Sequence, residues 1–217
     1  MPQQIGFLSI GMVILGVEAI FNGIILSGSE PTEVYQWQRA KILLGGFHPA
    51  IWLGFSLIFG NSTYKNTIKK WKWGIGFLLF LPAMILLTFP KAFLVDGHTA
   101  IQKGLFLFRI GWAGYAFHTI VLLGFIAILA QLERTLRSSA GRARWQIKFM
   151  VLGLCSLWGE RIYEISQTLL YWELDLELQV LNLGTLIAAN ALMSIGIRRM
   201  PSIQLSFCPS QSFFITR

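Results

Sequence analysis

Residues 149–172 read FMVLGLCSLWGERIYEISQTLLYW, an apolar run of membrane-spanning length with three ionisable residues near its middle, Glu160, Arg161 and Glu164. A charge at the centre of a bilayer costs about 2.5–3.5 kcal/mol on insertion scales, so such residues usually face the interior of a helical bundle. Side chains three or four positions apart share one helix face, and Gln167 continues the same stripe. We therefore expect a helix with one polar face turned toward other helices and one face turned toward lipid.

The composition of the whole chain is that of an integral membrane protein. Of 217 residues, 54% are hydrophobic and only 13% are charged, about half the share of a typical soluble domain. No predicted loop is long enough to hold a soluble catalytic domain. The net charge of +8 is explained by where the basic residues lie, and we expect no nucleic-acid partner.

Six apolar runs are long enough to cross a hydrocarbon core of about 30 Å as helices. We expect these spans at Ile5–Leu26, Ile42–Gly60, Trp73–Leu94, Gly104–Ala130, Ile147–Trp172 and Leu176–Ile197. The predicted fold is an all-α integral membrane protein, with a six-helix transmembrane bundle over residues 1–200. Residues 201–217 are expected to form a cytoplasmic tail, disordered or truncated.

Loop charges give this bundle an orientation. The basic residues gather in two loops and after the last span: Lys65, Lys69, Lys70, Lys72, Arg134, Arg137, Arg142, Arg144, Lys148, Arg198 and Arg199. The remaining loops are acidic or balanced. Because Lys and Arg in short loops stay in the cytoplasm, we expect both termini there.

The orientation aligns polar residues of different spans by depth. It places Glu18 and Asn22 in the outer half of the first span, and Arg109 near the outer end of the fourth with His118 near its middle. We expect one intramembrane polar cluster in the outer half of the bundle, with Glu18 and Arg109 as partners of the charges quoted above. Its predicted members are Glu18, Asn22, Arg109, His118, Glu160, Arg161, Glu164 and Gln167.

Three roles for this cluster remain open. It can be structural, with buried ion pairs that fix helix register; it can be a ligand- or proton-sensing pocket; or it can line a transport path. His48, His98 and His118 lack metal-ligand spacing, and Cys155 and Cys208 form no spaced pairs, so we expect no metal and no cofactor. Motifs of soluble hydrolases, kinases and nucleotide-binding loops are absent from the sequence.

Part of the chain resembles a known family. Two segments carry the resemblance: the stretch LERTLRSSAGRARWQIKFMVLGLCSLWGERIYEISQTLLYW and the following span, which ends SIGIRR. Together they are similar to the N-terminal membrane region of sensor histidine kinases of the exosortase/PEP-CTERM exopolysaccharide system. The resemblance covers about Glu133 to Arg199, and HPAIWLGFSLIFG adds a weaker likeness. It implies an input module in a bacterial inner membrane, coupled to a dimeric cytoplasmic kinase.

The sequence departs from that family in one respect. The family's phosphoacceptor helix and ATP-binding domain have no counterpart in these 217 residues, so no catalytic residue carries over. We expect a non-catalytic sensor module that signals by helix repacking, with the lipid bilayer and a cytoplasmic kinase module or a second copy of the chain as partners. The alternatives are a small transporter or channel subunit, and, less well supported, a membrane-embedded enzyme.

Overall fold

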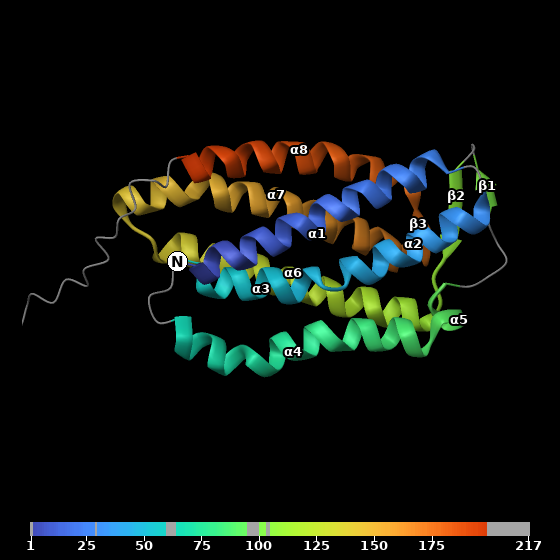
Figure 1. Cartoon of the computed structure of the whole chain (residues 1–217), viewed down its shortest axis with the longest axis horizontal. Helices are drawn as coiled ribbons and strands as arrows, with labels where there is room; N and C mark the ends of the chain where they lie inside the picture. Colours follow the sequence, from blue (N-terminus) through green and yellow to red (C-terminus); the bar gives the residue numbers. More distant parts are fainter. Residues whose placement is uncertain (1, 29, 60–63, 95–99, 103–104, 199–217) are drawn as a thin grey trace, which may run out of the picture.

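The computed structural model describes residues 2–28, 30–59, 64–94, 100–102 and 105–198. The chain is predominantly helical, and its long helices lie side by side along one axis of a bundle (Figure 1). The helices are α1 (Pro2–Ser27), α2 (Pro31–Gly45), α3 (His48–Ile58), α4 (Tyr64–Thr88), α5 (Pro90–Phe93), α6 (Trp112–Ser138), α7 (Gly141–Tyr171) and α8 (Leu176–Arg198).

Five stretches in the described residues are long and apolar enough to cross a membrane: Gly6–Ser27, Thr32–Ile58, Thr67–Thr88, Trp112–Ser138 and Leu178–Arg198. They confirm that the chain has the helices of a multi-pass membrane protein. Helix α7 is not among the five, since its middle carries the charges of Glu160, Arg161 and Glu164. It has 31 residues, a length of about 46 Å at 1.5 Å per residue, and it packs against α6 and α8.

A small sheet closes one end of the bundle, and here the all-α prediction is wrong in detail. Strands β1 (Ala100–Gln102), β2 (Leu105–Arg109) and β3 (Glu173–Asp175) pair antiparallel in the order β1-β2-β3. The predicted fourth span was expected to begin at Gly104, but α6 begins at Trp112. The predicted tail, 201–217, lies outside the described residues.

The second apolar stretch is one span whose helix is broken near its middle. Helix α2 ends at Gly45 and α3 begins at His48, since Pro49 has no N–H to donate to the carbonyl of Gly45 and glycine is a poor helix former. The N–H of Gly46 still bonds the carbonyl of Ile42 at 3.0 Å, while that of Phe47 reaches back only to Leu44. The chain therefore turns within the bundle, and this turn brings His48 inside.

Close approaches fix the helices around that turn. Gly124 of α6 lies against Pro49, and a Cβ at Gly124 would come within 2.5 Å of the Pro49 Cβ. Helices α7 and α8 meet closely at Gly153, where a Cβ would lie 2.8 Å from the Ala189 carbonyl oxygen. Small residues at such contacts let membrane helices approach to backbone distance.

One face of α4 is exposed on the outside of the bundle. It carries a stripe of large apolar residues: Trp73, Phe77, Phe80, Met84 and Leu87.

Candidate functional site

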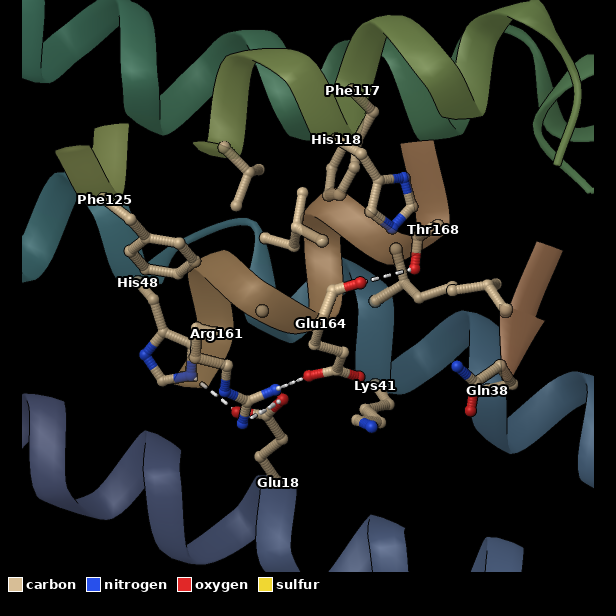
Figure 2. A pocket seen from close by; sticks show the side chains of 15 residues that line it. Glu18, Gln38, Lys41, His48, Phe117, His118, Phe125, Arg161, Glu164 and Thr168 are labelled. Carbon is tan, nitrogen blue, oxygen red and sulfur yellow. Dashed lines mark hydrogen bonds and ion pairs between the residues drawn. The ribbon is translucent and has the colours of Figure 1, made fainter. Parts of the chain in front are cut away.

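The guanidinium of Arg161 on α7 is the centre of a buried charge cluster (Figure 2). Its Nη2 lies 2.9 Å from Glu18 Oε1 of α1, and its Nη1 donates to Glu164 Oε2 at 3.3 Å. Glu160 Oε2 is 4.0 Å from its Nε. The carboxamide of Asn182 on α8, turned with its oxygen toward Arg161, accepts from Nη1 at 2.8 Å and from Nη2 at 2.9 Å. One side chain thus joins α7 to both α1 and α8.

Glu18 extends this network to the broken helix. Its second oxygen, Oε2, lies 2.7 Å from His48 Nε2 at the start of α3, and both side chains are almost fully buried. A carboxylate only accepts, so Nε2 carries the hydrogen in this bond and Nδ1 is left as an acceptor. The turn between α2 and α3 is what places His48 against Glu18.

Aromatic side chains pack below the charges, on the side of the basic loops. The ring of Trp158 stacks on Phe125 with centroids 4.8 Å apart, and meets Trp52 at 5.2 Å and His48 at 5.7 Å. Trp52, Phe125 and Trp158 are each at most 2% exposed. They form an aromatic floor, the name we use below for these three residues.

A cavity of about 60 Å³ opens beside Arg161. Its wall is drawn from α1, α2, α3, α6, α7 and β3, and it includes the polar side chains of Glu18, Gln38, Lys41, His48, His118, Arg161, Glu164 and Thr168. A volume of roughly 10–15 Å³ on this measure holds one water, so the cavity has room for several. Figure 2 shows these side chains converging from separate helices on one space.

His118 of α6 lies on the wall of this cavity. The sequence predicted it near the middle of the fourth span, as a member of the polar cluster. Its Nδ1 donates to the carbonyl of Gly114 at 2.7 Å, one turn earlier in the same helix. In that tautomer Nε2 is an acceptor. The ring also packs against Phe93 and Phe117. In its neutral form His118 therefore contributes an acceptor to the wall.

Most of the predicted cluster residues are in or near the cluster, and the predicted pairing of Glu18 with Arg161 is present. Arg109 is not part of it: it lies exposed in β2, opposite Glu173 of β3. The sequence predicted a helix over 104–111 and so placed Arg109 inside the membrane. Residues 105–109 instead form strand β2, which places Arg109 at the end of the bundle. Asn22 is buried one turn beyond Glu18 with its Oδ1 unpartnered, and Gln167 is half-buried; neither lines the cavity.

Four functional candidates were missed from the sequence: Gln38, Lys41, His48 as a partner of Glu18, and Asn182. The predicted second span begins at Ile42 and so leaves Lys41 outside it, whereas α2 begins at Pro31. The spacing of Gln38 and Lys41, three apart on one helix face, was the signal available. Among the described residues no group of three or more His, Cys, Asp and Glu is arranged to hold a metal ion.

Comparison of the chain with models of protein families, with curated proteins and with solved structures gives no match.

Proposed function

We propose that the protein is a membrane-embedded sensor module of the histidine-kinase type, non-catalytic by itself, in a bacterial inner membrane. The cavity beside Arg161 receives the input, and α7 and α8 carry the output to a partner in the cytoplasm. The supporting observation is that Arg161 joins α7 to Glu18 of α1 and Asn182 of α8 at the wall of a cavity. A change in protonation there alters the charge balance around Arg161, and a change in occupancy alters the contacts between the helices of the wall. Either change shifts the population of helix packings.

The proposal includes six membrane crossings with both termini in the cytoplasm. The start of α4 and the ends of α6 and α8 lie at the end of the bundle opposite the sheet (Figure 1). These segments carry the basic residues Lys69, Lys70, Arg137 and Arg198. Short basic loops favour the cytoplasm. Helix α7 is counted as a crossing because it is long enough and because its central charges have partners inside the bundle.

A topology measurement tests this arrangement. A reporter that is active only in the cytoplasm, fused after Arg199, is expected to be active, and the same reporter inserted within 95–99, between α5 and β1, is expected to be silent. The reason is the charge asymmetry of the loops. Activity of the second fusion, or silence of the first, would contradict the six-crossing topology.

A distance measurement tests signalling by helix repacking. In a background without Cys155 and Cys208, spin labels at the exposed positions Ser9 of α1 and Ile197 of α8 report how far the two helix ends lie apart in lipid nanodiscs. We expect the distance distribution to differ between acidic and neutral pH, and Glu160→Gln, which removes the carboxyl 4.0 Å from Arg161 Nε, to hold one distribution at both.

The control for that measurement is Glu133→Gln, which removes a carboxylate from an exposed ion pair with Arg137 and should leave the pH response as in the parent protein. An unchanged distribution in the parent and in Glu160→Gln, at acidic and neutral pH alike, would end proton sensing. If the distribution also fails to respond to an occupant of the cavity, the sensing proposal ends and the cluster is a structural device.

The break between α2 and α3 favours one alternative, a small transporter, since discontinuous helices at membrane depth often form the substrate sites of transporters. The aromatic floor argues against it, because Trp52, Phe125 and Trp158 close the cavity toward the basic loops. A sensor needs only a pocket open to one side, whereas a transporter opens to each side in turn, so the floor would have to open during transport. Solute flux into proteoliposomes containing the protein alone would favour the transporter.

A further inference from the structure

Lys41 is a buried cation on the cavity wall, only 4% exposed, whose ammonium has no hydrogen-bond partner among the described residues. It offers three donors and no acceptor. Of the acids on the same wall, Glu18 uses both oxygens on Arg161 and His48, and Glu164 uses Oε2 on Arg161; neither accepts a hydrogen bond from Lys41. A buried charged donor without an acceptor is strongly unfavourable. An acceptor supplied from within the cavity would satisfy Lys41.

Gln38 lies one turn from Lys41 on the same face of α2 and also lines the cavity. It is 1% exposed, and none of the described residues donates to its Oε1. A group held beside both residues must therefore accept from Lys41 and donate to Gln38. A hydroxyl or a carboxamide does both. A carboxylate only accepts and an alkylammonium only donates, so each leaves one of the two residues unsatisfied.

The charges of the wall point to an uncharged occupant. Glu18 and Glu164 balance Lys41 and Arg161 among the lining residues. Glu160, whose Oε2 is 4.0 Å from Arg161 Nε, is not among the residues that line the cavity. A charged ligand would bring a further charge into a site of low dielectric constant without a counter-charge. A neutral ligand avoids that cost.

The rest of the wall is apolar and the space is small. Four buried apolar side chains line it: Phe117 and Val121 of α6, Ile165 of α7 and Leu174 of β3. The volume of about 60 Å³ corresponds to roughly four to six water-sized probes. A short apolar chain of a few carbons fits beside a polar head at Lys41 and Gln38.

We propose that the cavity binds a small uncharged solute with a hydroxyl or carboxamide head, held between Lys41 and Gln38, and a short apolar chain against α6. This names the ligand class of the sensor site and rests on the proposed function for the claim that binding is transmitted. The binding itself follows from the wall of the cavity alone.

Four probes with the same three-carbon chain test the inference: n-propanol, propionamide, propionate and propylammonium. The measurement is the thermal unfolding midpoint of the purified full chain in detergent across a titration of each probe, since a ligand that binds only the folded state raises the midpoint. We expect the two neutral probes to raise it saturably and the two charged probes to have little effect. Lys41→Met and Gln38→Leu should each weaken binding of the neutral probes by about tenfold or more.

The matched control is Lys148→Met, which removes an exposed lysine of α7 and should bind as the parent does. Gln38→Leu keeps the test decisive if Lys41→Met fails to fold. A larger effect of propionate or propylammonium overturns the proposed ligand class. Equal effects in the parent and in Gln38→Leu mean that the probes partition into detergent, and no effect means that the cavity holds water only; both outcomes overturn the inference.

The spin-label pair at 9 and 197 separates this inference from the proposed function. Saturable binding of a neutral probe without any change in distance leaves the ligand site standing and removes the sensor. A distance change driven by pH, with no probe bound, keeps the sensor and removes the ligand site.

Discussion

Arg161→Met is expected to lower the free energy of unfolding by about 3–5 kcal/mol, the usual cost of removing one partner from a buried ion pair. The substitution leaves Glu18 and Glu164 without the cation that holds them at 2.9 and 3.3 Å. It also removes the donor to Asn182. The residue is only 7% exposed, so bulk solvent does not screen the two carboxylates that remain. The measurement is unfolding of the purified protein in mixed micelles titrated with a denaturing detergent.

Arg137→Met is the control for this prediction. Arg137 pairs with Glu133 at 2.6 Å one turn away on α6, with side chains 78% and 59% exposed, and exposed pairs contribute about 0–1 kcal/mol. A cost for Arg161→Met no larger than that of Arg137→Met would show that the buried cluster does not hold the bundle together. In a double-mutant cycle with Glu18→Gln, a coupling of about 0.5–3 kcal/mol is expected for residues in one network.

The pairing of Glu18 with Arg161 could be predicted because helices have a constant rise. Once the loop charges orient the spans, each residue of a straight helix has a defined depth. Two opposite charges at one depth, each too costly to face lipid, then become natural partners. The same argument placed His118 close to the cluster, where it lines the cavity.

The argument failed where the helix assignment failed. Residues 105–109, LFLFR, are an apolar run that a helix and a strand accommodate equally well. What makes them a strand is pairing with β3, in which Arg109 lies opposite Glu173, a contact across more than sixty positions of the chain. No local pattern carries that information. Arg109 was therefore given a depth along a helix that does not exist.

Lys41 was missed for a different reason. The mean hydropathy of a window falls wherever the window includes a charged residue. The second span was therefore predicted to start just after Lys41, at Ile42. In the structure α2 continues back to Pro31 and buries Lys41 among the acids of α1 and α7. A charge inside a span and a charge in a loop look alike to such a profile. Only the tertiary packing distinguishes them.

Trp158→Ala is expected to cost about 3 kcal/mol in the same unfolding assay. Truncation of a buried tryptophan in a soluble core costs about 3–5 kcal/mol. The low end applies here because lipid, unlike water, does not oppose exposure of apolar surface. Trp158 is 0% exposed and packs on Phe125, Trp52 and His48, so its removal leaves a void directly beneath the charge cluster.

Two further variants show whether the aromatic floor acts through packing. Trp158→Phe keeps an aromatic ring in the floor and should cost less than Trp158→Ala. Trp73→Ala removes a tryptophan of α4 that is 80% exposed, and a change of that kind is usually within about 0.5 kcal/mol. Equal costs for Trp158→Ala and Trp73→Ala would contradict a packed floor. Without the floor the cavity is no longer closed toward the basic loops, and the main argument for a sensor over a transporter is lost with it.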